Sequence, residues 1–330
     1  MNTMPHRRIT IVCAAILLSF LCVAGVWGCV GIGMNTSASV SEYAGMEGEY
    51  VQVQGLNIHT YISGVGRGDR IPVIFIHGFA ASFYCWRLNV EPLAVDGPVY
   101  APDLPGFGLS DKPRDYDYSL DGYADFIAAY MDAMGIERAV LVGNSMGGGI
   151  AVKTQIRHPD RVEGIVLIDA LGYFNNEFYL YRALGTYPLG EILLSCNNRL
   201  IMKTILKAKV YRDNAYATRE VVDSYVAVNR TENGRRSPVW VLRAMGAYPV
   251  IPTEQIRQVS APTLIMWGEK DRILPVSHAE LYYRDIEHSE LVIFPDVGHM
   301  PMEERSETVN NFIRGFIDKI SGGCGWGCCI

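Results

Sequence analysis

The feature that most constrains the fold is the segment from Ala139 to Gly149, which reads AVLVGNSMGGG. Its first residues are aliphatic, which predicts a short buried strand, and the glycines that follow predict a tight turn into a helix. The turn contains Gly143-x-Ser145-x-Gly147, which is typical of a nucleophile elbow, where a serine occupies a strained and exposed corner. Small residues are needed on both sides because strand and helix approach closely there. An ordinary glycine-rich turn can show the same short pattern, so the rest of the chain must decide.

Apolar runs alternate with helical segments on both sides of this turn. Residues 50–54 and 56–62 alternate about Gly55 and predict an opening hairpin. Further strands are expected at 71–76, 98–101, 162–168, 263–267 and 291–294, with helices at 120–134 and 303–320. This rhythm predicts an α/β fold with a mostly parallel sheet and helices on both faces. We assign its core to residues 49–170 and 260–320.

Between the two parts of the core, residues 171–259 break the rhythm. No strand is obvious there, aromatic residues are frequent, and apolar residues recur at helical spacing. We interpret the stretch as a helical cap inserted after the sixth strand, and we expect the substrate-binding residues within it. Most of its aromatic residues are expected to pack in a core.

The N-terminal residues form a long apolar segment. Arg7 and Arg8 precede a run from Ile9 that carries no charge until Glu42. The run is long enough to span a bilayer, and the flanking charges predict a cytoplasmic N-terminus with the catalytic domain exported. We therefore predict a membrane anchor at residues 1–33. The residues around Cys29 resemble a lipoprotein-type signal, which is the alternative, and either reading places the domain at the periplasmic or extracellular face.

Composition excludes several other classes of protein. The net charge of −6 without a basic stripe argues against a nucleic-acid partner. Six of the eight cysteines lie near the two ends of the chain, so a disulfide framework is not expected, and none forms a zinc-type pair. We predict neither a metal nor a cofactor. Residues 34–48 are interpreted as a linker, and the cysteine- and glycine-rich tail at 321–330 has no functional interpretation.

Four motifs follow one another at the ends of predicted strands. They read His77-Gly-Phe79, Gly143-x-Ser145-x-Gly147, Gly268-x-x-Asp271 and Asp296-Val-Gly-His299. Together they resemble the α/β-hydrolase superfamily, in which the catalytic groups follow in the order serine, acid, histidine. The resemblance extends from about residue 51 to residue 320.

The resemblance implies a role for each of these residues. Ser145 is the nucleophile, His299 the base that takes its proton, and Asp271 the acid that orients His299. The backbone N–H groups of Phe79 and Met146 form the oxyanion hole. His77 is expected to hold the oxyanion loop without taking part in the chemistry.

A second acid competes for the third role. Asp169 also follows a strand, and some members of the superfamily carry their acid at that position. We favour Asp271 because Gly268-x-x-Asp271 matches the commoner pattern. Asp296 lies too close to His299 in the chain to orient it well.

A serine nucleophile implies acyl transfer to water. The superfamily's dehalogenases and epoxide hydrolases carry an aspartate at this position, so those reactions are disfavoured. We predict an esterase or lipase acting on a small ester with an apolar acyl group. Two alternatives stay open: a C–C bond hydrolase of ring-fission diketones, whose members share the sequence around Ser145 but carry tryptophan where this chain has Met300, and a hydrolase-like receptor without turnover.

Overall fold

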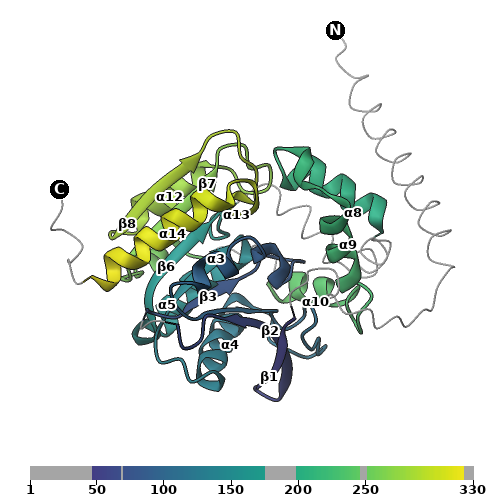
Figure 1. Ribbon diagram of the computed structural model, residues 1–330, viewed down its shortest axis with the longest axis horizontal. Coiled ribbons are helices and arrows are strands. Elements are labelled where there is room, and N and C mark those ends of the chain that lie inside the picture. The colour runs from purple at the N-terminus through teal and green to yellow at the C-terminus, as the bar shows by residue number, and fades with distance from the viewer. Residues whose placement is uncertain (1–46, 68–69, 175–197, 246–250, 323–330) are drawn as a thin grey trace, which may run out of the picture.

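The computed structural model describes residues 47–67, 70–174, 198–245 and 251–322. In these residues eight strands form one sheet in the order β1-β2-β4-β3-β5-β6-β7-β8 (Figure 1). The strands are β1 (Glu49–Val53), β2 (Leu56–Ser63), β3 (Val73–Ile76), β4 (Val99–Pro102), β5 (Ala139–Asn144), β6 (Val162–Ile168), β7 (Thr263–Gly268) and β8 (Ser289–Phe294). The opening hairpin pairs antiparallel, β2 also runs antiparallel to β4, and the pairs from β4 to β8 are parallel. The predicted α/β-hydrolase fold is confirmed.

Alternation along the central strands divides the core into two layers. In β5, Ala139 and Leu141 belong to one apolar cluster, whereas Val140 and Val142 belong to the other. Successive side chains of a strand point to opposite faces, so a strand covered on both faces must be apolar throughout. This explains why the aliphatic run before Ser145 forms the middle of the sheet.

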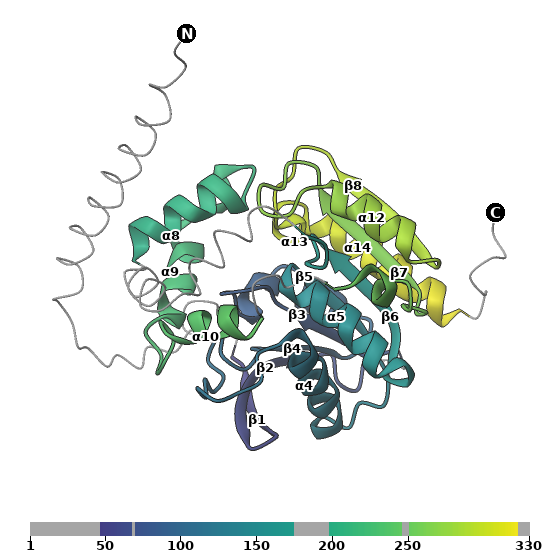
Figure 2. The same cartoon turned by 180° about the vertical axis from the view of Figure 1, so that it is seen from behind.

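Helices cover both faces of the sheet. Helices α3 (Val90–Ala94) and α14 (Ser306–Ser321) lie on the face toward the viewer in Figure 1, with the short α13 (Pro301–Glu304) before α14. Helices α4 (Leu120–Ala133), α5 (Met146–Arg157) and α12 (Ser277–Asp285) cover the opposite face, seen in Figure 2. The last helix was expected as one element from residue 303. It is instead divided at Arg305, whose backbone is not helical.

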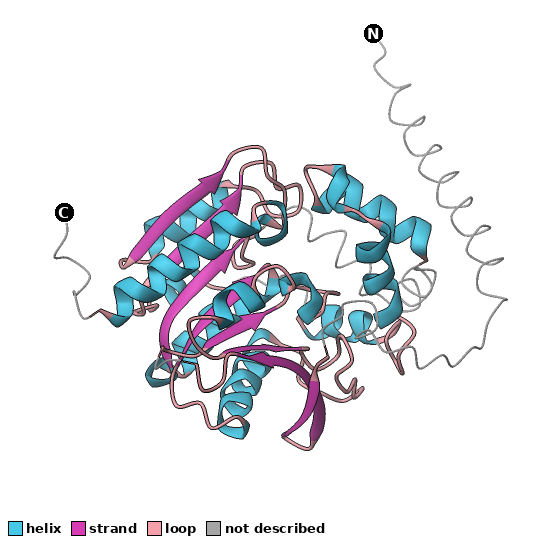
Figure 3. Cartoon of the chain, in the orientation of Figure 1, coloured by secondary structure: helices cyan, strands magenta, loops and turns pink. Residues whose placement is uncertain are grey.

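The described part of the chain between β6 and β7 is helical, as the predicted cap requires. It contains α8 (Arg199–Ile205), a π-helical turn (Leu206–Val210), α9 (Arg219–Val228), α10 (Ser237–Ala244) and α11 (Thr253–Ile256). Figure 3 shows α8, α9 and α10 gathered beside one end of the magenta strands. The exact bounds of the cap, 171–259, stay a prediction.

The two ends of the chain carry predictions that the structure does not reach. The proposed anchor at residues 1–33 lies outside the described residues, as do most of the linker and of the C-terminal tail. None of the helices in the described residues is both long enough and apolar enough to cross a membrane. Among the described cysteines, Cys85 is a buried free thiol.

Candidate active site

Ser145 occupies the corner between β5 and α5. Its backbone has φ 55° and ψ −119°, a combination that costs a residue with a Cβ free energy and persists only where the surroundings enforce it. Hydrogen bonds supply that enforcement. The Ser145 N–H donates to the carbonyl of Ile168 at 3.0 Å, and the Ser145 carbonyl accepts from the N–H of Leu171 at 2.8 Å. The serine is partly exposed, whereas the residues on either side of it are buried.

The two glycines of the motif are required by close backbone contacts. A Cβ on Gly143 would lie 2.3 Å from the carbonyl oxygen of Gly147, and a Cβ on Gly147 would lie 2.0 Å from the carbonyl oxygen of Ile76. No side chain fits at such distances. The glycines therefore let α5 start directly against β3 and β5, which fixes the corner that carries Ser145.

The structure brings His299 and Asp271 together. His299 Nδ1 lies 2.7 Å from Asp271 Oδ2, and both side chains are buried. The other carboxylate oxygen, Oδ1, accepts from the N–H groups of Ile273 at 2.7 Å and Leu274 at 3.1 Å. A carboxylate held by donors in this way accepts the Nδ1 proton of the imidazole, which leaves Nε2 as the unprotonated nitrogen.

The loop of His299 is tied to the residue that precedes the serine. Asn144 donates from Nδ2 to the carbonyl of His299 at 3.2 Å and to the carbonyl of Ile168 at 3.1 Å. No hydrogen bond joins the Ser145 hydroxyl to His299 among the described residues. Such contacts are often long without substrate and shorten in the reacting complex.

The predicted oxyanion-hole residues lie beside the serine. A Cβ on Gly78 would approach the Cβ of Ser145 to 3.1 Å, so the loop that carries Phe79 passes directly against Ser145. Met146 is the first residue of α5, and N–H groups in the first turn of a helix have no acceptor within the helix. Phe79 and Met146 therefore both lie close to Ser145 in the chain or in space, and their role as oxyanion-hole donors stays a prediction.

His77 has a supporting place in this loop. Its ring is fully buried, accepts from the N–H of Leu104 at Nε2 (2.9 Å), and donates from Nδ1 to the carbonyl of Gly78 at 2.8 Å. Burial lowers the pKa of His77, so the ring is neutral. The hydrogen bonds hold the oxyanion loop against the loop that follows β4.

Glu304 joins the cap to the loop of His299, and sequence reasoning did not identify it. Its Oε1 accepts from the N–H of Gly298 at 2.8 Å, and its Oε2 accepts from the N–H groups of Arg212 at 3.1 Å and Asp213 at 3.0 Å. The N–H of His299 itself donates to the carbonyl of Val210 at 2.8 Å. Burial raises the pKa of Glu304. No local pattern marks this glutamate, because its partners in the cap are about 90 residues away in the chain.

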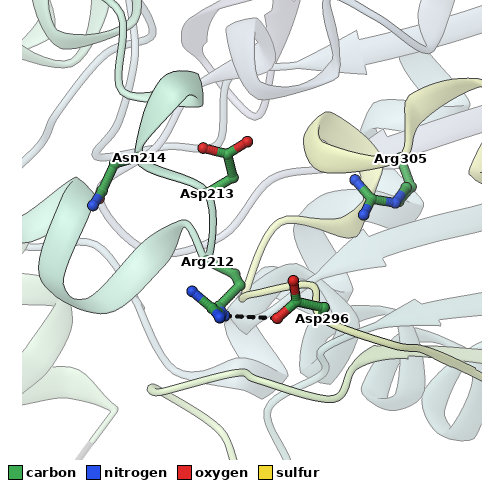
Figure 4. Close-up of a pocket in the computed structure, with 5 residues that line it drawn as sticks. All are labelled: Arg212, Asp213, Asn214, Asp296 and Arg305. Carbon is green, nitrogen blue, oxygen red and sulfur yellow. Dashed lines mark hydrogen bonds and ion pairs between the residues drawn. The ribbon is translucent and has the colours of Figure 1, made fainter.

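A polar pocket of about 350 Å³ opens where the cap meets this loop. Figure 4 shows its lining residues, which are Arg212, Asp213, Asn214, Asp296 and Arg305. Arg212 donates to Asp296 across the pocket at 2.8 Å. Neither Ser145 nor His299 lines it, so we do not assign the reacting part of a substrate to this pocket.

Asp169, the rival acid, lies next to the chosen one. Oxygens of Asp169 and Asp271 and a ring nitrogen of His299 all lie within 4.8 Å of one another. Among the described residues this is the group of side chains that could hold a metal ion. The Asp271 carboxylate, however, is already engaged by His299 and by two backbone donors.

Comparison with known proteins agrees with this geometry. Residues 71–306 match the family model of the alpha/beta hydrolase fold. The "Uncharacterized hydrolase YugF" of Bacillus subtilis (strain 168) is 27% identical over 268 residues, which cover 80% of this chain and 96% of that protein. The chain belongs to the alpha/beta hydrolase fold family, and it is a hydrolase.

Two solved structures bear on the kind of hydrolase. A meta-cleavage product hydrolase (CumD, A129V mutant) superimposes with a TM-score of 0.70 at 29% identity, covering 82% of this chain and 98% of that one. A membrane phospholipase A, described as a bacterial virulence factor, gives a TM-score of 0.71 at 26% identity and covers 96% of this chain and 97% of that one. The relatives therefore include both C–C bond and ester hydrolases.

Proposed function

We propose that this chain is a serine hydrolase that cleaves a carboxylic ester through an acyl-enzyme. The observation that carries the proposal is the 2.7 Å contact between His299 Nδ1 and Asp271 Oδ2, at the same sheet edge as the strained elbow of Ser145. His299 takes the hydroxyl proton as Ser145 attacks the ester carbonyl, and Asp271 stabilises the imidazolium that forms.

The oxyanion of the tetrahedral intermediate is stabilised by backbone donors. The N–H groups of Met146 and Phe79 fill this role, supported by the position of Met146 at the helix start and of the Phe79 loop against Ser145. His299 then returns its proton to the leaving alcohol. A water molecule, activated by the same imidazole, attacks the acyl-enzyme and releases the acid.

We infer an apolar acyl group of short to medium length. An apolar pocket distinguishes substrates by only about 1–3 kcal/mol per methylene, so a broad preference over chain length is expected. The phospholipase among the similar structures supports an ester substrate.

The competing proposal is hydrolysis of a ring-fission diketone, which the similarity to CumD favours. Such a substrate carries a carboxylate and would need cationic side chains over the serine. Arg230, Arg235 and Arg236 are the cap residues considered for this task, and all three are solvent-exposed. Met300 also stands where the C–C hydrolases usually carry tryptophan. We therefore place the ester first.

Kinetics with both substrate classes tests the assignment. We expect kcat/KM for p-nitrophenyl butyrate or octanoate to exceed that for a ring-fission diketone by several orders of magnitude, with Ser145→Ala as the matched inactive control. A higher kcat/KM for the diketone would replace the ester as the proposed substrate, while the proposed roles of Ser145, His299 and Asp271 would stay unchanged. Binding of these compounds without any turnover would instead support the receptor alternative.

We further propose that the N-terminal segment anchors the protein in a membrane and that the catalytic domain is exported. The uncharged run from Ile9 and the arginines before it motivate this, and the membrane phospholipase resembles 96% of this chain. Full-length protein should sediment with membranes and resist extraction by carbonate, whereas a chain starting at Met34 should not. Recovery of the full-length protein in a soluble cytoplasmic fraction would contradict the anchor.

A further inference from the structure

A second buried carboxyl group, that of Asp169, lies beside Asp271 and His299 and takes no part in the chemical steps proposed above. Asp169 follows β6, is fully buried, and has a positive φ of 45°. Its Oδ1 accepts from the N–H of Gly268, at the end of β7, at 3.0 Å. Its Oδ2 is also buried, and no N–H or O–H group of the described residues donates to it. Sequence reasoning treated Asp169 and Asp271 as alternatives, but the structure places them side by side.

The surroundings of Asp169 oppose a second negative charge. Its oxygen lies within 4.8 Å of both Asp271 and His299, and Glu304 on α13 adds another acidic group. His278 on α12 lies close enough to Asp271 to sense its charge, but burial lowers the pKa of that imidazole. Burial above all, and then the charge of Asp271, raise the pKa of Asp169 well above its usual range. These surroundings favour the protonated, neutral form of the Asp169 carboxyl group.

The Asp271 carboxylate has room for one more donor. A carboxylate offers about four acceptor positions, two on each oxygen. Two backbone N–H groups occupy Oδ1, and His299 Nδ1 occupies one position on Oδ2. A protonated Asp169 can supply the fourth donor. Its buried Oδ2, which otherwise has no hydrogen-bond partner among the described residues, then gains one.

We propose that Asp169 is a positioning residue, a protonated acid whose O–H donates to Asp271 and thereby holds that carboxylate in line with His299. This inference rests on the proposed function, because it assigns Asp271 as the acid of the triad. In this proposal the two carboxyl groups of Asp169 and Asp271 share a single negative charge, which Asp271 carries.

The test compares Asp169→Asn with Asp169→Ala and Asp271→Asn. Asparagine is neutral, like a protonated acid. Its side-chain oxygen can accept from the N–H of Gly268, and its side-chain N–H can donate to Asp271. We therefore expect Asp169→Asn to retain kcat/KM within about threefold and to leave the midpoint of the acid limb of its pH profile unchanged. Asp169→Ala should lose about 10–100-fold, by analogy with the loss when a group that orients a metal-bound histidine is removed.

Two results would overturn the proposal. If Asp169 were ionised, Asp169→Asn would remove an anion beside His299 and lower the acid-limb midpoint by about 1–3 units. If Asp169→Ala kept full activity, Asp169 would have no positioning role. Thermal melting of each variant identifies any that fail to fold. If Asp169→Ala fails to fold, the pH profile of Asp169→Asn still decides between a protonated and an ionised Asp169.

A readout independent of turnover separates this inference from the ester assignment. The infrared band of a buried protonated carboxylic acid should be present in the wild-type protein at neutral pH and absent in Asp169→Asn. No difference in that band between wild type and Asp169→Asn refutes the protonated acid, whatever the substrate proves to be. Conversely, the band can be present while ester hydrolysis is absent, which refutes only the proposed function.

Discussion

The backbone of Ser145 should store strain that a substitution can release. Its φ of 55° and ψ of −119° lie in a region that glycine enters freely. A side chain there costs about 1–3 kcal/mol. Ser145→Ala keeps the Cβ and therefore the strain. Ser145→Gly releases the strain, but its more flexible unfolded chain lowers the free energy of unfolding by about 0.4–1 kcal/mol. The glycine variant should therefore be more stable than the alanine variant by about 1 kcal/mol.

This difference is measurable by calorimetry on the two variants, both of which lack the Ser145 hydroxyl. For a domain of this size, about 1 kcal/mol corresponds to a shift in Tm of about 2–4 °C. Ser82 provides a matched control, because its backbone is extended with φ −151° and its side chain makes no cap hydrogen bond. There the glycine variant should be the less stable one. A Ser145→Gly protein no more stable than Ser145→Ala would show that the elbow is not strained.

Three further predictions concern the acids around the site. Asp271→Asn should lower kcat by about 10⁴, by analogy with serine proteases, and a loss below tenfold in steady-state assays would exclude it as the orienting acid. Glu304→Ala removes the acceptor of three backbone N–H groups and should lower the free energy of unfolding, measured by urea titration, by about 3 kcal/mol or more. Glu304→Gln keeps an acceptor oxygen and should lose less. Equal losses in the two variants would contradict this interpretation. Because the pKa of Asp169 is raised in the folded state, its stabilising contribution is complete below about pH 4 and is lost as pH rises toward the folded value. The stability of Asp169→Asn relative to wild type should thus increase as pH rises above about 4, by at most about 1.4 kcal/mol per pH unit, until the folded-state pKa of Asp169 is reached. A difference independent of pH would refute the shift.

The sequence predicted the sheet well because its signals are local. The aliphatic run of β5 is buried on both faces, and the glycines around Ser145 are required by contacts within one strand–turn–helix unit. The order of the four motifs then placed Ser145, Asp271 and His299 at strand ends. Parallel strands bring such ends to one edge of the sheet, so the proximity of these three residues follows from the sequence pattern.

The contacts that support the site could not be predicted in this way. Asn144 reaches His299 across 155 positions in the chain, and Glu304 binds the cap across about 90. Neither residue belongs to a periodic pattern or a spaced motif that would indicate its partner. The raised pKa of Asp169 depends on burial and on the nearby charge of Asp271, which only the folded arrangement defines.

The most direct test of the central claim is covalent labelling of the nucleophile. Intact-mass spectrometry after treatment with a fluorophosphonate, followed by peptide mapping, should find one adduct, located on Ser145. Ser145→Ala should give none, and His299→Ala should react far more slowly because the hydroxyl then lacks its base. Undiminished labelling of Ser145→Ala, or an adduct mapped to another residue, would contradict the assignment of Ser145 as the nucleophile.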